Sequence, residues 1–213
     1  MEFISEDLLY YCEQHSESES PLLAKLNRDT HAKILMPRML SGHLQGRLLS
    51  MLSQIIRPEF ILEIGTYTGY SALCLSEGLS ENGRLITIDI NDELEEFVKG
   101  YIVESGKENN IIQLTGNALE IIPQLDYIFD LVFIDANKEE YSEYYDLIID
   151  KVKPGGILLV DNVLWSGQIL KPLEKQDPET KCVSSFNEKI KGDKRVKVMM
   201  LPIRDGISII RKL

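Results

Sequence analysis

The chain has 213 residues, 44% hydrophobic and 27% charged, which suits one globular domain with one substantial core. Its net charge of -11 and pI of about 4.8 disfavour phosphate-rich partners such as nucleic acids or anionic membranes. No apolar run approaches the roughly 18 residues of a membrane-spanning helix, and the N-terminus is acidic where a signal peptide is basic. We therefore expect a cytoplasmic protein with a single domain, residues 1–213.

Residues 1–56 are predicted to form helices that cap the functional site. Two apolar stripes are separated by the polar run 16–20 and by Pro21, which suits the first turn of a helix. Pro37 marks a loop, and a third helix is predicted from Ser41 to about Ile56. Its apolar side chains recur three and four residues apart, which is typical of a face packed on a core. That face comprises Leu44, Leu48, Leu49, Leu52, Ile55 and Ile56.

From residue 57 onward, short apolar runs alternate with amphipathic segments, a pattern that favours a parallel sheet covered by helices on both faces. A helix is predicted over 183–190. Two final strands flank the turn 202–206, which is short enough for an antiparallel hairpin. The predicted strands are 61–64, 85–89, 111–114, 131–135, 157–161, 196–201 and 207–213. The sequence thus predicts an α/β fold.

The stretch 60–71, Phe-Ile-Leu-Glu-Ile-Gly-Thr-Tyr-Thr-Gly-Tyr-Ser, joins a predicted strand to a predicted helix through two glycines four residues apart. Such a turn lets a cofactor approach the main chain closely. In a dinucleotide-binding loop a glycine stands where this chain has Glu63, and a carboxylate there repels a pyrophosphate. It attracts a cofactor with positive charge, as S-adenosylmethionine (SAM) has. With Asp89 placed to accept ribose hydroxyls, the loop favours a methyltransferase over a dehydrogenase.

Acidic side chains stand at or near the ends of several predicted strands. Ligands in an open α/β sheet bind beyond the carboxyl ends of the strands. Carboxylates crowded at one edge are costly unless a positive group lies among them. The residues concerned are Glu63, Asp89, Asp135 and Asp161, with Asn162 following the last of them.

Six motifs resemble, in the same order, those of the cation-dependent O-methyltransferases of the caffeoyl-CoA and catechol type, in a bacterial-type member. They are Glu63–Ser71, Asp89–Asn91, Phe133–Lys138, Gly155–Gly156, Asp161–Trp165 and Met200–Gly206, and the resemblance covers roughly residues 36–213. It implies a class I methyltransferase, Rossmann-like fold: a seven-stranded, mostly parallel sheet with a C-terminal antiparallel hairpin, helices on both faces and extra N-terminal helices. It also implies SAM as donor, a divalent cation and a homodimer.

The resemblance also assigns roles to residues of this sequence. Metal ligands would be Asp135, Asp161 and Asn162, and the catalytic residues would be Lys138 and Asp135. The cofactor-binding residues would be Met39, Ser41, Glu63, Gly65, Tyr67, Ser71, Asp89, Ala118 and Asp135. Met39 and Ser41 would contact the methionine moiety, and Ala118 would lie near the adenine.

The chemistry of these residues is consistent with such a reaction. Two carboxylates and one amide suit a hard cation, Mg²⁺ above all, with Ca²⁺ or Mn²⁺ as alternatives, and they leave about three coordination positions open. Two adjacent hydroxyls of a catechol would fill two of these and be oriented there. Lys138 follows Asp135 by three residues, and its amine is a candidate acceptor for the phenolic proton. The simpler interpretation of Lys138 is a surface lysine among the acidic Glu139 and Glu140.

The function predicted from the sequence is methylation of a catechol-like small molecule. A tRNA hydroxyuridine O-methyltransferase is the alternative, because some bacterial relatives with similar motifs modify tRNA, although the acidic composition disfavours it. A catalytically silent cofactor-binding module is a third hypothesis, disfavoured by the intact set of candidate metal ligands. Residues 1–40 and 165–182, which match the family least, are expected to set the choice of acceptor.

Overall fold

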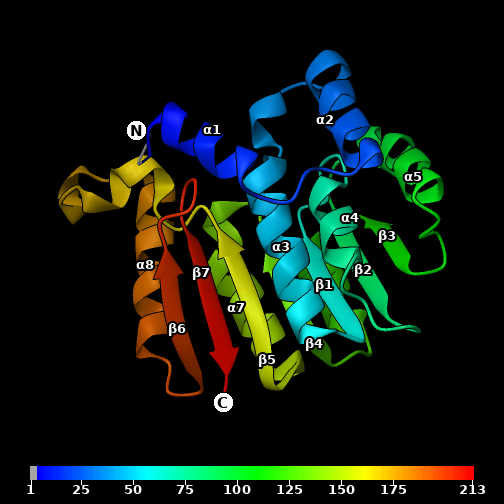
Figure 1. The fold of residues 1–213 in the computed structure, drawn as a ribbon. Coiled ribbons are helices and arrows are strands. Elements are labelled where there is room, and N and C mark those ends of the chain that lie inside the picture. Colours follow the sequence, from blue (N-terminus) through cyan, green and yellow to red (C-terminus); the bar gives the residue numbers. More distant parts are fainter. Residues whose placement is uncertain (1–3) are drawn as a thin grey trace. The chain divides into compact units, whose positions relative to one another are not determined.

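The computed structural model describes residues 4–213, and its ribbon is shown in Figure 1. The chain divides into two compact units, the N-terminal unit (residues 4–117) and the C-terminal unit (residues 118–213). Seven strands form one sheet, in the order β3 (Ile111–Thr115), β2 (Arg84–Asp89), β1 (Phe60–Ile64), β4 (Phe129–Ile134), β5 (Val152–Asp161), β7 (Ile207–Lys212) and β6 (Val196–Leu201). The α/β fold with a mostly parallel sheet and a C-terminal antiparallel hairpin is confirmed. A single domain with N-terminal helices that cap the site stays a prediction.

The N-terminal unit holds the helices predicted before residue 57 and the first three strands. Ser20 caps the second helix by accepting a hydrogen bond from the backbone of Leu23, and Pro21 fills the first helical position. The strands are parallel, with Ile61 opposite Leu85 in the first pair. Its main elements are α1 (Glu6–Gln14), α2 (Pro21–Lys33), α3 (Gly42–Ile56), β1 (Phe60–Ile64), α4 (Tyr70–Ser76), β2 (Arg84–Asp89), α5 (Glu95–Glu104) and β3 (Ile111–Thr115).

Helix α3 buries a different face from the one predicted. Of the six apolar side chains expected in the core only Leu49 is fully buried, and Ile55 is 73% exposed. The buried face is mostly small and polar because α4 approaches closely: a Cβ on Gly46 would lie 2.6 Å from the ring of Tyr70. The residues buried on α3 are Gln45, Gly46, Arg47, Leu49, Ser50 and Ser53. Apolar periodicity located the helix but not the side that packs.

The C-terminal unit holds the remaining strands and the two longest helices of that unit. Strands β4 and β5 are parallel, and β7 runs antiparallel to both β5 and β6. Figure 1 shows this hairpin, in red, beside β5, with α7 and α8 behind the strands. Its main elements are α6 (Ala118–Ile121), β4 (Phe129–Ile134), α7 (Tyr141–Ile148), β5 (Val152–Asp161), α8 (Pro178–Gly192), β6 (Val196–Leu201) and β7 (Ile207–Lys212).

The predicted strand boundaries are close to the observed ones, with two informative differences. Strand β4 begins at Phe129 and ends at Ile134, so that Asp135 stands just beyond its carboxyl end. Strand β5 begins at Val152, five residues before the predicted start at Ile157. None of the helices in residues 4–213 combines the length and apolar character that crossing a bilayer requires.

Candidate functional site

The carboxylate of Glu63 lies fully buried in β1, where a hydroxyl of the neighbouring strand holds it. The register pairs Glu63 with Thr87 of β2, and Thr87 Oγ1 donates to Glu63 Oε2 at 2.6 Å. Because that hydroxyl gives its proton to Glu63, the Thr66 hydroxyl, 2.5 Å from Thr87 Oγ1, must donate to it. A chain of two hydroxyls therefore sets the orientation of Glu63 at the start of the glycine loop.

The glycine loop after β1 contains the backbone shapes that its sequence predicts. Gly65 and Gly69 have φ of 100° and 85°, and the non-glycine Tyr67 also lies in the left-handed region, at 47°. Asp89 holds this loop in place: its Oδ2 accepts from Tyr67 N at 2.7 Å, and its Oδ1 accepts from Asn91 N at 2.9 Å. Each carboxylate oxygen retains a second lone pair for a ligand hydroxyl.

The side chain of Tyr67 joins the glycine loop to the segment before α3. Its hydroxyl lies 2.9 Å from the carbonyl oxygen of Leu35 and 3.2 Å from that of Met36, and it donates to this pair. Met39 ends the following short helical turn and is 54% exposed, whereas Ser41 is buried at the start of α3. Tyr67 therefore links the glycine loop to the segment that carries Met39 and Ser41, the residues predicted to contact the methionine moiety.

Seven of the nine predicted cofactor residues belong to the N-terminal unit. They are Met39, Ser41, Glu63, Gly65, Tyr67, Ser71 and Asp89. Ser71 is buried in the first turn of α4. The other two, Ala118 and Asp135, belong to the C-terminal unit, where Ala118 is buried at the start of α6.

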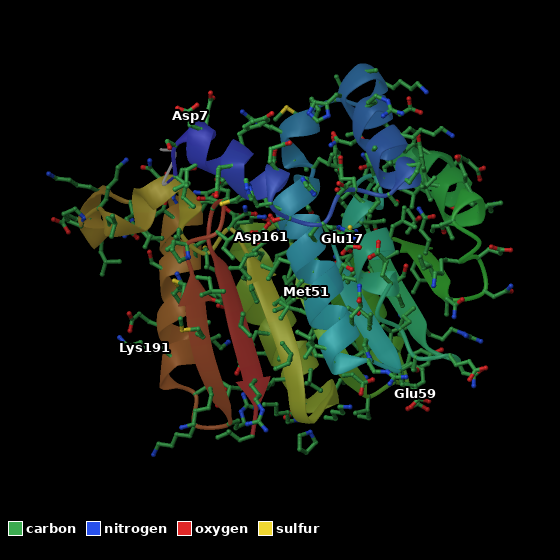
Figure 2. The ribbon with its side chains drawn as sticks, viewed as in Figure 1. Asp7, Glu17, Met51, Glu59, Asp161 and Lys191 are labelled. Atoms are coloured by element: carbon green, nitrogen blue, oxygen red, sulfur yellow. The ribbon has the colours of Figure 1, made fainter. Side chains whose placement is uncertain are left out.

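Asp135 and Asp161 stand at matching positions at the carboxyl ends of neighbouring parallel strands. Ile134 is opposite Val160 in the register, so Asp135, just beyond β4, comes next to Asp161, the last residue of β5, at about the 4.8 Å spacing of neighbouring strands. Figure 2 shows Asp161 at the carboxyl end of β5. Its Oδ1 accepts from Asn162 N at 2.8 Å, and Asn162 adopts a left-handed φ of 57°. The C-terminal unit therefore gathers two carboxylates and an amide at one edge.

Lys138 is held among these residues rather than exposed as a surface lysine. Its Nζ lies 2.9 Å from Asp135 Oδ1, and its side chain is only 12% exposed. The same ammonium lies 5.4 Å from the ring centroid of Tyr141 and 6.0 Å from that of Trp165. A carboxylate and two aromatic faces all attract a positive charge.

Tyr141 is fully buried in the C-terminal unit, close to the two aspartates. Burial raises the pKa of its phenol well above the usual value, and the charges of Asp135 and Asp161 add to that effect. Its hydroxyl therefore stays protonated and donates to the main-chain oxygen of Asp161 at 3.0 Å. Burial also raises the pKa of Asp205, whose carboxylate accepts from the backbone of Ser166.

Several residues that hold these functional groups were not predicted from the sequence, among them Thr87, Tyr141 and Asn187. Thr87 did carry a signal in the sequence. It stands two residues before Asp89 on the second strand, as Glu63 stands two residues before Gly65 on the first, and the register places the two opposite each other. Asn187 of α8 also carried one, as a polar residue on the face formed by Val183, Phe186 and Ile190; its Nδ2 donates to Val163 O at 2.8 Å. Tyr141 is a fully buried core residue whose hydroxyl makes a directed hydrogen bond.

The residues present fit a hard cation by their chemistry. Within residues 4–213 there is no group of three or more histidine, cysteine, aspartate or glutamate side chains placed to hold a metal. The set formed by Asp135, Asp161 and Asn162 has two carboxylates and one amide, all oxygen donors, which is what Mg²⁺, Ca²⁺ and Mn²⁺ prefer.

Comparisons with known proteins find methyltransferases that are similar in sequence and in fold. A family model described as O-methyltransferase matches residues 13–213. Caffeoyl-CoA O-methyltransferase 5 of Nicotiana tabacum is 32% identical over 217 residues, which cover 96% of this chain and 90% of that protein. The O-methyltransferase TomG of Streptomyces achromogenes, solved with SAM, superposes with a TM-score of 0.90 at 29% identity, covering 98% of this chain and 99% of that one. The SAH-bound methyltransferase PaMTH1 of Podospora anserina gives a TM-score of 0.90 at 27% identity, with 98% and 94% covered.

Proposed function

This chain belongs to the O-methyltransferase family, and we propose that it transfers the methyl group of SAM to one hydroxyl of a catechol-like acceptor with the help of a divalent cation. That it is a SAM-dependent O-methyltransferase of the caffeoyl-CoA type follows from the family and from similar structures holding SAM and SAH. The observation that carries the finer proposal is the β4–β5 register, which sets Asp135 beside Asp161 at two strand ends.

In this proposal the N-terminal unit binds the methyl donor. Glu63, oriented by the Thr87 hydroxyl, supplies the negative charge that favours a cationic cofactor. Asp89 uses its remaining lone pairs for the ribose hydroxyls while its other contacts keep the glycine loop in shape. The positive φ of Gly65 lets the cofactor approach the backbone closely, as only a residue without Cβ permits at low cost.

The C-terminal unit is proposed to bind the cation and the acceptor. Asp135, Asp161 and Asn162 would hold the cation, which when bound orients two adjacent acceptor oxygens and stabilises the ionised one. Lys138 stands beside Asp135, where its Nζ is placed to exchange a proton or a hydrogen bond with the acceptor oxygen. Trp165 and Tyr141 flank that amine and keep it from swinging into solvent.

Removal of the cation tests this proposal directly. Methyl transfer from radiolabelled SAM to a catechol should be lost in excess chelator and return when Mg²⁺ is added. Calorimetric SAM binding in the same chelator serves as the control, and we expect it to be retained because the predicted donor residues lie mostly in the N-terminal unit. Full methylation in excess chelator would overturn the proposed cation dependence, but SAM would remain the methyl donor.

The alternative acceptor, a tRNA base, would require a basic surface near Asp161. The lysines around one surface hollow of about 370 Å³, Lys191, Lys194 and Lys197, lie elsewhere. Val196 pairs with Lys212 at the open end of the hairpin. Asp161 pairs with Ile207, the first residue of β7, at the opposite end next to the hairpin turn. Figure 2 shows the labels of Lys191 and Asp161 well apart.

A single screen of acceptors decides between these substrate classes. Catechols, hydroxycinnamoyl thioesters and unmodified tRNA would each be offered with radiolabelled SAM. We expect methylation of the first two classes only, since the charge of -11 disfavours a polyanion. Labelling of tRNA alone would replace the catechol proposal.

A further inference from the structure

The turn that follows β5 has a shape that its own sequence does not enforce. Asn162 takes a left-handed φ of 57°, a region in which side chains other than glycine are uncommon, although asparagine tolerates it. The strand ends at Asp161, so no strand ladder fixes the next residues. We call residues 161–164 the ligand turn, because it carries two of the three candidate cation ligands. Its conformation must be imposed by neighbours.

Three elements of the C-terminal unit bond the backbone of the ligand turn. From α7, the hydroxyl of Tyr141 donates to Asp161 O at 3.0 Å. From α8, Asn187 Nδ2 donates to Val163 O at 2.8 Å. The turn between β6 and β7 receives the two amides, Val163 N to Gly206 O at 3.2 Å and Leu164 N to Asp205 O at 2.9 Å.

The side chain of Asn162 contrasts with this bonded backbone. Asn162 N bonds the Asp161 carboxylate, and Asn162 O accepts from Trp165 N at 3.2 Å. Within residues 4–213 its side-chain amide makes no hydrogen bond. Main-chain hydrogen bonds therefore fix the turn, and the side-chain amide of Asn162 is available to bind a ligand.

Tyr141 and Asn187 are both placed to act as rigid supports. Tyr141 is fully buried at the start of α7, and its ring packs edge-on against Phe186 of α8 with the centroids 5.5 Å apart. Asn187 follows Phe186, and its Oδ1 is buried without a hydrogen-bond partner in the part of the chain described. An apolar residue would avoid that cost of burial, so the asparagine at this position is explained by its donor.

We propose that Tyr141 and Asn187 are positioning residues for cation binding, which hold the ligand turn so that Asp161 and Asn162 converge on one ion. This inference rests on the cation-dependent function proposed above. Groups that orient the ligands of a metal commonly contribute a factor of 10 to 100 in metal affinity. They would act without touching the cation themselves.

The test compares Mn²⁺ binding by the full chain and by three variants, followed through the electron paramagnetic resonance signal of free Mn²⁺. Tyr141→Phe removes only the hydroxyl, and Asn187→Leu removes the donor together with the unpaired acceptor. Tyr145→Phe is the matched control: it stands on the same helix and contacts the same Phe186, but its hydroxyl donates to Asp193 at 2.9 Å. Melting temperatures are measured alongside.

We expect the Mn²⁺ dissociation constant to rise roughly 10-fold in Tyr141→Phe and Asn187→Leu and to stay within about twofold in Tyr145→Phe. Asn187→Leu loses a buried unpaired acceptor but also leaves Val163 O without its donor, and because these two effects oppose each other its melting temperature should stay close to that of the parent chain. Weakened Mn²⁺ binding in a protein of unchanged stability separates positioning from a merely structural role. If Tyr141→Phe does not fold, Asn187→Leu carries the test.

Three results would overturn the inference, and they differ in whether the proposed function survives. Parent-like Mn²⁺ binding in both variants, or an equal weakening in Tyr145→Phe, rejects the positioning role but leaves the proposed function standing. A parent chain that binds no Mn²⁺ at millimolar concentration rejects both together.

Discussion

The two units hold their functional groups in different ways. In the N-terminal unit the supports are strand residues: Glu63 is bonded by Thr87 of β2, 24 residues on, and the glycine loop by Asp89 of β2, 22 residues from Tyr67. In the C-terminal unit the ligand turn is bonded by side chains of two helices, 20 and 24 residues away, and by the turn before β7, up to 43 residues from Val163. Glycines and a neighbouring strand shape the first site, and helix side chains with a later turn shape the second. Substitutions in each unit should therefore separate donor binding from cation binding.

The largest effect is expected from Asp161→Ala, which removes a cation ligand from the C-terminal unit. Methyl transfer should fall roughly 10²–10³-fold, because a group that acts on the charge developing in the reaction is lost. SAM affinity, measured by calorimetry, should stay within about twofold. Asp146→Ala, an exposed carboxylate of α7 paired with Lys189, serves as control. Equal loss of SAM binding and turnover in Asp161→Ala would contradict the separation of the two sites.

Glu63→Gln should produce the converse result in the N-terminal unit. The amide keeps the shape and can accept from Thr87, but the negative charge is lost, so the dissociation constant of SAM should rise about 10- to 100-fold. Mn²⁺ binding should not change. Glu59→Gln, just before the same strand and exposed, is the control. Unchanged SAM affinity would remove Glu63 from the donor site.

Thr87→Val tests the hydroxyl chain behind Glu63 with a smaller expected effect. Valine has the same shape without the donor, and a loss of about 1 kcal/mol corresponds to a rise of roughly fivefold in the SAM dissociation constant. Thr115→Val at the end of β3 removes a comparable hydroxyl bond, to Glu95 at 2.9 Å, and should leave SAM affinity unchanged. Identical behaviour of the two variants would show that Thr87 does not orient Glu63.

Tyr67→Phe should have the smallest effect on affinity. It removes the hydroxyl bonded to Leu35 and Met36 while leaving the ring and the backbone contact to Asp89. Backbone amides around residues 36–40 should exchange hydrogen faster, with SAM affinity reduced about twofold. Tyr101→Phe, which loses a bond to Asp29 elsewhere in the unit, is the comparison. Unaltered exchange at 36–40 would mean that Tyr67 does not restrain this segment.

Much of the fold was predictable because it depends on local patterns. The apolar runs located every strand, and Pro21 and the hairpin turn 202–206 fixed two boundaries. The packing face of α3 was not predictable: the close approach of α4 replaces large apolar contacts with Gly46 and with an Arg47–Glu77 ion pair. Such an approach leaves no periodic signal in one sequence.

The same distinction applies to the candidate site. Glu63, Asp89, Asp135 and Asp161 were found because each stands at or near a strand end, and strand ends follow from apolar runs. Tyr141 and Asn187 support the ligand turn through tertiary contacts, and nothing in their local sequence specifies which carbonyl they bond. The burial of Lys138 likewise depends on Trp165 of a distant loop.

The closing of the ligand turn by Asp205 and Gly206 has a consequence for synthesis on the ribosome. The segments that build the donor-binding loop emerge early, all within residues 35–91. The ligand turn emerges later, and it lacks its last support until residues 205–206 have left the exit tunnel. The amides of Val163 and Leu164 donate to the carbonyl oxygens of those two residues. We therefore expect a nascent chain to acquire its donor-binding contacts before its cation-binding ones, as domains fold from the N-terminus during translation.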